Sequence, residues 1–388
     1  MANWKTKFEN LVEDIDNFSD HLRGRLRKIG DFDESLTIVP FIGYGTADRF
    51  LLSGRVLEDK GAIESSGENS RWENLQNMYR RFATDEIAEA RVRARFRNVE
   101  SEFVTDKEGY FNVILDTVEV ADDNRLFQEI ELELLEPQNK NGHTARAVGQ
   151  ILVPPATARF GVISDLDDTV IVTNVTDRLK MFLTVALLNE YTRMPFKGVA
   201  AFYRALQAGA TGAENNPIFY VSSSPWNLYS PLTEFLRIQN IPLGALFLKD
   251  FGRHTIFSSG DHRSHKLNSI EAILNTYPNL PFVLIGDSGE QDPEIYREII
   301  NKYPKRIRVV YIRSVNTKEE RVRAIDRLIG EISETGCQLV LAPDTAFAAA
   351  HAAGEKLIAA DALPLIREEK REDEAAPTAL EITEDFKE

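Results

Sequence analysis

An apolar run over residues 160–164 that ends in Asp165 constrains the fold more than any other segment. The run is short, and the chain enters it from a loop at Pro154 and Pro155, so we predict a buried parallel strand. Open α/β sheets bind their ligands at the carboxyl edge of such strands. Asp165 is therefore expected at that edge, with Asp167 turned back toward the same space from the following turn.

Asp165, Asp167 and Thr169 form the pattern D-x-D-x-T. One carboxylate can attack phosphorus while the other handles the proton of the leaving group, provided that their environments differ. Because both carboxylates repel a phosphate, a divalent cation is required. Mg²⁺ is expected, since it favours carboxylate, carbonyl and phosphate oxygens. The pattern indicates phosphoryl transfer through an aspartyl-phosphate, although Asp-rich turns and helix caps also produce it.

Two further segments supply groups for a transferring phosphoryl. Residues 217–222, PIFYVS, predict a second apolar strand that ends in Ser222, whose hydroxyl can donate to a phosphoryl oxygen; a Ser-rich turn or helix cap is the alternative. Lys266 opens a helical pattern with apolar residues at positions 267, 270, 273 and 274. It would hold the nucleophile and the phosphoryl group by charge. Lys249 competes for that role, and a solvated surface lysine is the remaining interpretation.

The segment PFVLIGDSGEQD, residues 281–292, predicts a third strand with an acidic tip. Asp287 at the strand end is placed to ligate a metal, and Gly286 and Gly289 allow tight backbone geometry. Asp292 lies directly before Pro293, a favourable first-turn proline. Asp292 is therefore either the cap of the next helix or part of the metal site.

Four motifs in this order resemble those of the haloacid dehalogenase superfamily. More narrowly, the chain from about Arg159 to Ile358 resembles the actin-patch-associated phosphatidate phosphatase catalytic-domain family. The resemblance is carried by the segments SDLDDTV, TRMPFKGVAAFYRAL, FYVSSSPWNLY, HKLNSIEAIL and FVLIGDSGEQDPEIY. Upstream, IVPFIGYGTADRFLLSGRVLED resembles the amino-terminal region of bacterial members. The resemblance implies Mg²⁺-dependent removal of phosphate from phosphatidate, giving diacylglycerol.

The resemblance also implies roles for individual residues. Asp165 would be the nucleophile, Asp167 the general acid and base, and Thr169 a support of the loop. Ser222 and Lys266 would hold the phosphoryl group. The expected metal ligands are Asp165, Asp167, Asp287 and Asp292.

The substrate is open, because loops around a constant chemistry set specificity. The same chemistry on a soluble phosphoester or phosphoprotein is one alternative to phosphatidate, and a non-catalytic phosphate-binding scaffold is another. The pair Asp165 and Asp167 argues against a scaffold, since binding alone needs no nucleophile beside an acid. Trp226, Tyr229 and Arg313 are candidates for substrate contact.

The pattern along the chain predicts an α/β protein in four parts. Residues 1–30 form an amphipathic helix, and residues 35–157 form a small all-β, sandwich-like domain with a hairpin turn at 106–109 and a helix around 70–82. Residues 158–362 alternate strands and helices, which predicts a parallel sheet with right-handed crossovers, and the resemblance implies that this sheet is haloacid-dehalogenase-like with helices on both faces. Residues 367–388 are charged and poor in large apolar side chains, which favours a disordered acidic tail.

Two patterned surfaces keep more than one interpretation. The helix over 4–26 carries an apolar stripe that either packs on this protein's own body, forms a homodimer or lies on a membrane surface. Arg91, Arg93, Arg95 and Arg97 share one face of a strand. They form either a solvated face paired with acids across the sheet or a surface that binds phosphate groups.

Composition limits the class of partner. The formal net charge of −15 over 388 residues excludes nucleic acid as the expected partner and disfavours adsorption to an anionic bilayer. This charge is in tension with phosphatidate at a membrane surface. The single cysteine, Cys337, fits a reducing compartment and is expected to pack before a strand. With a polar start and no apolar run of spanning length, we expect a cytoplasmic protein that lacks a transmembrane segment, peripheral at membranes if its substrate is a lipid.

Overall fold

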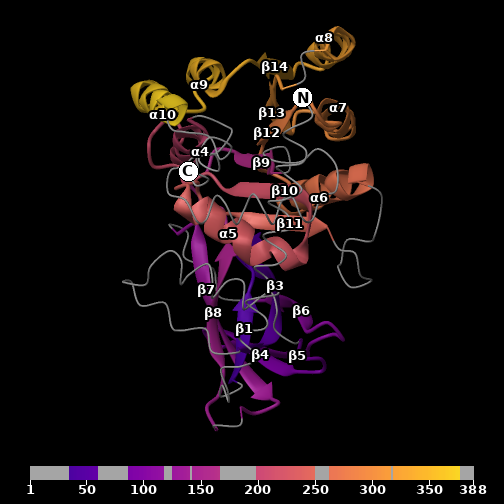
Figure 1. Ribbon diagram of the computed structural model, residues 1–388, viewed down its shortest axis with the longest axis vertical. Coiled ribbons are helices and arrows are strands. Elements are labelled where there is room, and N and C mark those ends of the chain that lie inside the picture. Colours follow the sequence, from indigo (N-terminus) through magenta and orange to yellow (C-terminus); the bar gives the residue numbers. More distant parts are fainter. Residues whose placement is uncertain are drawn as a thin grey trace, which may run out of the picture.

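The computed structural model contains an N-terminal β-domain and a C-terminal α/β domain (Figure 1). It describes residues 35–59, 86–117, 125–139, 142–166, 198–249, 262–315 and 318–375. The predicted helices over 1–30 and around 70–82 lie outside these ranges, as do Asp167 and Thr169. No helix in the described part of the chain is long and apolar enough to span a membrane.

The α/β domain is organised around a six-stranded parallel sheet in the order β11-β10-β9-β12-β13-β14. The strands are β9 (Gly161–Asp165), β10 (Ile218–Pro225), β11 (Ala245–Lys249), β12 (Phe282–Asp287), β13 (Ile307–Arg313) and β14 (Gln338–Ala342). The chain runs from β9 outward through β10 and β11, then returns to the other side of β9 to form β12. The strand order therefore reverses between β9 and β12, the place where open α/β sheets bind ligands.

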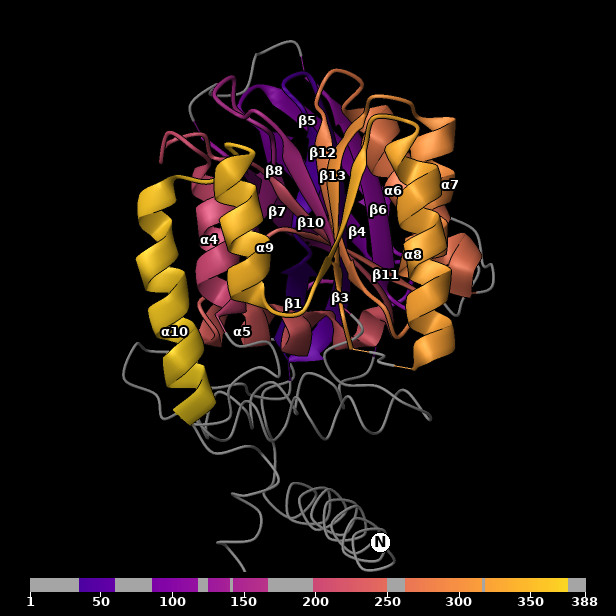
Figure 2. The ribbon, with the colours of Figure 1, turned by 90° about the horizontal axis from the view of Figure 1, so that it is seen from above.

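Helices cover both faces of this sheet (Figure 2). One face carries α4 (Val199–Ala208), α5 (Tyr229–Ile238), α9 (Thr345–Gly354) and α10 (Leu363–Ala375). The other carries α6 (His262–Thr276), α7 (Asp292–Lys302) and α8 (Glu319–Ser333). The central strands are buried on both sides, which explains their continuous apolar runs. The predicted parallel sheet with two helical layers is confirmed.

The β-domain differs from the predicted sandwich, because its described strands form one hydrogen-bonded sheet. The order is β1-β3-β2-β8-β7-β4-β5, with β6 also paired to β3. The strands are β1 (Ser35–Pro40), β2 (Gly43–Thr46), β3 (Arg49–Asp59), β4 (Arg91–Phe96), β5 (Val99–Val104), β6 (Tyr110–Asp116), β7 (Phe127–Glu136) and β8 (Arg146–Leu152). The long strand β3 pairs with β1 and β2 along one edge and with β6 along the other. It therefore connects β6 to the other strands, which would lie in separate sheets of a sandwich. Phe50, Val92, Phe111 and Ile130 share the single core.

The predicted turn at 106–109 is present, but it does not close a hairpin. Gly109 has a φ of 75°, and the Asp106 carboxylate accepts hydrogen bonds from the backbone N–H groups of Glu108 and Tyr110, both at 2.9 Å. The strands on either side pair elsewhere, β5 with β4 and β6 with β3. Local turn chemistry was therefore predictable, whereas the partners of the two strands depended on distant segments.

The arginine face of β4 is paired with acids across the sheet. Arg93 contacts Glu102 at 2.8 Å and Glu133 at 3.6 Å, and Arg95 forms an ion pair with Glu131. Arg91 contacts Glu136 at 2.8 Å. This confirms the solvated, charge-paired interpretation for these three arginines and gives no support to a phosphate-binding strand. Arg97 was wrongly placed on the same face, because β4 ends at Phe96 and Arg97 has a φ of 51° in the turn that follows.

The two domains pack together through the β1–β2 segment. The Phe41 ring stacks on Trp226 at a centroid distance of 4.9 Å. The Ile42 N–H donates to the Tyr229 hydroxyl at 2.5 Å, and the Gly45 N–H donates to another tyrosine hydroxyl of the α/β domain at 3.1 Å. This domain interface, instead of substrate contact, accounts for Trp226 and Tyr229.

The tail predicted to be disordered from residue 367 is helical as far as Ala375, because α10 spans Leu363–Ala375. Ile366 is 1% exposed and packs in the core. The Glu369 carboxylate accepts from the Ala201 N–H at 3.0 Å and forms an ion pair with Arg204 on α4. One buried apolar residue, one hydrogen bond and one ion pair hold a segment whose composition alone favours disorder. Residues 376–388 lie outside the described ranges.

Candidate active site

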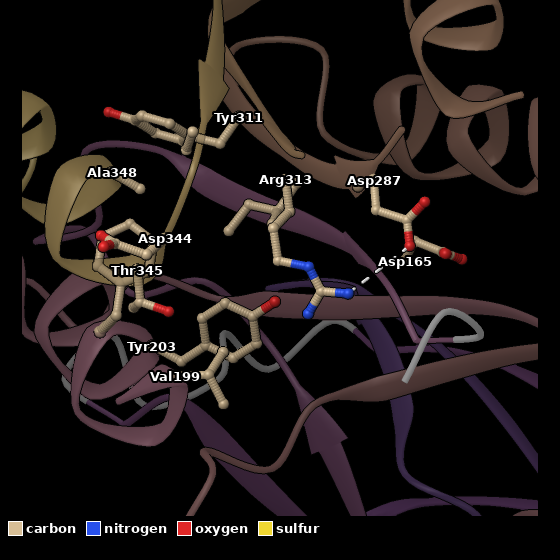
Figure 3. Close-up of a pocket in the computed structure, with 13 residues that line it drawn as sticks. Asp165, Val199, Tyr203, Asp287, Tyr311, Arg313, Asp344, Thr345 and Ala348 are labelled. Atoms are coloured by element: carbon tan, nitrogen blue, oxygen red, sulfur yellow. Dashed lines mark ion pairs between the residues drawn. The ribbon is translucent and has the colours of Figure 1, made fainter. Parts of the chain in front are cut away.

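Two aspartates meet at the switch point of the parallel sheet. Asp165 is the last residue of β9 and Asp287 the last residue of β12, and these strands are direct neighbours. Their side chains are 3% and 4% exposed. Figure 3 shows both carboxylates at one end of a pocket. The prediction that the two strand tips converge is confirmed for these two residues.

Lys266 is at the centre of the acidic group. Its Nζ lies 2.7 Å from Asp165 Oδ1, 2.6 Å from Glu290 Oε2 and 3.1 Å from Asp292 Oδ1. The lysine extends from α6 and is 2% exposed. The competing Lys249 ends β11, which β10 separates from β9. The structure therefore places Lys266 on the predicted nucleophile.

Asp292 supports this arrangement and does not cap α7. The cap position is Gln291, while Asp292 Oδ1 accepts from Lys266 and Oδ2 accepts from the Asp287 N–H at 3.1 Å. Burial raises the pKa of Asp292 to about 6, and the charge of Lys266 opposes that rise. A Cβ at Gly286 would lie 2.3 Å from Asp292 Oδ2, so only glycine lets the aspartate approach the strand.

Ser222 follows the part of β10 that pairs with β9. Val221 is in register with Asp165, and Ser222 Oγ accepts from the Ser224 N–H at 3.0 Å. His265 Nε2 lies 3.1 Å from the carbonyl oxygen of Ser222. Because a carbonyl oxygen can only accept, this nitrogen carries the proton and donates. His265 therefore ties β10, which continues past the predicted end at Ser222 to Pro225, to the helix that carries Lys266.

The loop after β12 is held from a distant helix. Asp287 Oδ1 accepts from the N–H groups of Gly289 and Glu290, at 2.6 and 3.2 Å. Arg321 on α8 donates from Nε to the Ser288 carbonyl oxygen at 2.9 Å and from Nη2 to the Glu290 carbonyl oxygen at 2.5 Å. The loop that carries Glu290 is therefore held by the Asp287 carboxylate at its start and by the Arg321 guanidinium from α8.

Arg313 and Tyr203 form the pocket wall beside the aspartates. Arg313 ends β13, and its Nη2 lies 4.0 Å from Asp287 Oδ2 (Figure 3). The Tyr203 hydroxyl is 2.6 Å from Ser164 Oγ, one residue before Asp165. Burial raises the pKa of Tyr203 to about 12, so its hydroxyl stays protonated near neutral pH.

The charges of the site fit a divalent cation. Four carboxylates, those of Asp165, Asp287, Glu290 and Asp292, face the two cations Lys266 and Arg313. Asp287 Oδ2 is buried and accepts no hydrogen bond from the described residues. Such an oxygen is costly to bury unless a cation engages it.

Another group of carboxylates has ligand oxygens close enough together for a metal, namely Asp165, Glu290 and Asp292. All three already contact the Lys266 ammonium, which occupies the space between them. We therefore assign this group to holding Lys266. Asp165 and Asp287, at the tips of neighbouring strands, are the candidates for a metal that we take forward from the described residues.

Glu290, His265 and Arg321 take part in the site without having been predicted. Glu290 and His265 adjoin motif residues in the sequence, but nothing local distinguishes them from solvated side chains. Arg321 gives no local signal at all, because its carbonyl partners lie about thirty residues earlier in the chain. Tertiary contacts alone reveal these three.

Comparisons with known proteins agree with this geometry. Residues 160–314 match the family described as phosphatidate phosphatase APP1, catalytic domain. The phosphatidate phosphatase APP1 of Saccharomyces cerevisiae is 35% identical over 171 residues, which are 43% of this chain and 28% of that protein. An uncharacterised protein of Schizosaccharomyces pombe is 30% identical over 239 residues, 60% of this chain and 37% of that protein. The chain thus spans about a third of the length of these relatives.

A solved structure of a carbohydrate acetylesterase from Xanthomonas citri aligns with 73% of this chain and 70% of its own, at 12% identity. Its TM-score of 0.23 is too low to carry an argument about the fold. The family match, in contrast, covers Asp165, Ser222, Lys266 and Asp287. Through residues 160–314, this chain is therefore similar to phosphatidate phosphatase APP1 catalytic domains.

Proposed function

We propose that this protein is a Mg²⁺-dependent phosphatase that acts through an aspartyl-phosphate on phosphatidate and yields diacylglycerol. The observation that carries the proposal is the 2.7 Å contact between buried Lys266 and Asp165 at the switch point of the sheet. A nucleophilic carboxylate needs a neighbouring cation to approach a phosphate. The family match adds the expected substrate class.

In the proposed reaction, a carboxylate oxygen of Asp165 attacks phosphorus, and the bond between phosphorus and the ester oxygen breaks. Asp167 gives its proton to the departing alcohol oxygen. It then takes a proton from the water that attacks the phosphorus of the aspartyl-phosphate, which releases inorganic phosphate and restores the Asp165 carboxylate. The role of Asp167 rests on its place in the motif, because it lies outside the described residues.

Lys266 would neutralise the transferring phosphoryl group, and three carboxylates fix its ammonium in place. Preorganised charge of this kind lowers the barrier without reorganisation during the reaction. The Ser222 hydroxyl would donate to a phosphoryl oxygen, and Thr169 would support the loop that carries Asp167. Arg313, at the pocket wall, is the candidate for a second contact with the phosphate.

Asp165 and Asp287 would hold Mg²⁺ together with Asp167. The buried Asp287 Oδ2, which no described hydrogen-bond donor engages, favours this assignment. When bound, the ion would offset the repulsion between these carboxylates and the substrate phosphate. Asp292, whose two oxygens engage Lys266 and the Asp287 N–H, would act by holding Lys266 instead of as a ligand.

The decisive experiment measures phosphate release by the purified full-length chain with Mg²⁺, comparing phosphatidate in mixed micelles with a panel of soluble phosphomonoesters. We expect release from phosphatidate by the wild type and none by Asp165→Asn, with the fold intact by circular dichroism. Asp326→Asn, an exposed carboxylate on α8, is the matched control and should keep full activity. Wild-type protein that releases no phosphate from any of these substrates would overturn the enzymatic proposal.

A second measurement separates a lipid substrate from a soluble one. The net charge of −15 and the paired arginines of β4 give the molecule no evident attraction to an anionic surface. We therefore expect flotation with phosphatidate-containing vesicles to depend on the substrate headgroup and to be lost with phosphatidylserine at equal charge. Absence of both flotation and lipid turnover would favour a soluble phosphoester or phosphoprotein.

A further inference from the structure

The pocket at Asp165 continues away from the carboxylates as a groove between α4 and α9. Its empty volume, counted out to open solvent, is about 590 Å³. Figure 3 shows the order along it: Asp165 and Asp287 at one end, Arg313 in the middle, and Ala348 and Thr345 beyond. A ligand whose phosphate lies at Asp165 therefore has a built space for the rest of its body.

The lining beyond Arg313 is largely apolar. Five of its side chains are hydrocarbon throughout and come from the sheet and from the helices on one of its faces, namely Val199, Phe202, Ile285, Ala342 and Ala348. The rings of Tyr203 and Tyr311 complete the walls. Such walls bind hydrocarbon and do not compensate a hydroxylated ligand for its lost water.

The polar groups of this wall are already engaged by the protein. The Tyr203 hydroxyl pairs with Ser164, and the Tyr311 hydroxyl lies 3.0 Å from His351 Nδ1. Asp344 accepts from Lys370 at 2.7 Å and from the N–H of Phe347 at 2.8 Å. Beyond Arg313, the Thr345 hydroxyl is the other polar side-chain group of the described lining. A sugar or nucleoside would therefore meet few free partners for its hydroxyl groups, whereas a hydrocarbon chain needs none.

We infer that this groove binds an acyl chain of the substrate, with Arg313 at the boundary between the phosphate and the hydrocarbon. This inference rests on the proposed function and deepens it, because it favours a lipid phosphate over a sugar phosphate or nucleotide. The guanidinium matches the anionic headgroup, and the apolar wall matches the chain that leaves it. Selectivity would then be a property of the groove itself, in addition to any effect of a membrane surface.

The test is a comparison of kcat/KM for short phosphatidates below their critical micelle concentrations, where no membrane surface contributes. In wild type we expect dioctanoyl phosphatidate to be preferred over dibutyryl phosphatidate by at least a hundredfold. Ala348→Leu places three further carbon atoms in the groove, and we expect it to lower this preference at least tenfold. Using the ratio of two substrates cancels differences in the folded fraction of enzyme.

Ala350→Leu is the matched control, because Ala350 lies on the same helix and faces solvent. We expect it to keep the wild-type preference. Thr345→Leu, at the partly exposed far end of the groove, provides a second variant in case Ala348→Leu does not fold. An unchanged preference in a folded groove variant, or equal losses on both substrates, would overturn the inference while phosphate release itself stands. Wild type inactive on all substrates would instead refute the proposed function, and this inference with it.

Discussion

Removing the charge of Lys266 should damage stability in a way that depends on pH. Lys266→Met would keep most of the side-chain volume but leave the carboxylates of Asp165, Glu290 and Asp292 facing one another, with ligand atoms within 4.8 Å. Loss of one partner from a buried ion pair costs about 3–5 kcal/mol. Against a typical free energy of unfolding of about 5–15 kcal/mol, this is a large fraction.

The sign of the pH dependence follows from Asp292. Burial already raises its pKa to about 6 with Lys266 present, and loss of the lysine charge raises it further. A carboxyl whose folded-state pKa exceeds its unfolded value binds more protons in the folded state between those two values. The variant should therefore gain stability, relative to wild type, as the pH falls from 8 through 6 toward 5, with each unit of pKa difference worth about 1.4 kcal/mol.

Equilibrium urea unfolding at pH 8 and pH 5, in the presence of EDTA, would measure this difference. We expect a loss of about 3–5 kcal/mol at pH 8 and a clearly smaller one at pH 5. Lys302→Met is the matched control, since Lys302 pairs with Glu271 at 2.5 Å while its side chain is 56% exposed, and it should change little at either pH. An equal loss at both pH values would refute the assignment of the three carboxylates as charged partners of Lys266.

Three further outcomes test two supports of the site and the burial of the single cysteine. Arg321→Gln, which removes donors to the loop after β12, should raise the Mg²⁺ concentration for half-maximal phosphate release by on the order of tenfold, and an unchanged titration would contradict that role. Gly286→Ala, whose Cβ would meet Asp292, should cost about 1–3 kcal/mol and abolish turnover. Gly330→Ala, in an open part of α8, should not lower the melting temperature. Burial raises the pKa of the Cys337 thiol to about 11, so at pH 8 it should react with Ellman's reagent only after unfolding, and rapid native reaction would refute its burial.

Several local features of this protein were predictable from the sequence. Asp165 and Asp287 end continuous apolar runs, and parallel strands bring their carboxyl ends to one edge whatever the loops do. The period-two arginines of β4 likewise indicated a charged strand face. These properties depend on a few consecutive residues and on the repeat of the backbone, and the chain encodes both directly.

The arrangement of partners came from the tertiary structure alone. Strand order placed β10 between β11 and β9, and the packing of the helices brought Lys266, not Lys249, to Asp165. In the β-domain, pairing between strands that are distant in the sequence joined the described strands into one sheet. Tertiary packing also turned Asp292 toward Lys266 and Asp287. It stabilised as a helix a segment whose composition favours disorder. Contacts between residues far apart in the chain depend on how whole elements bury their faces together, and no local pattern specifies that choice.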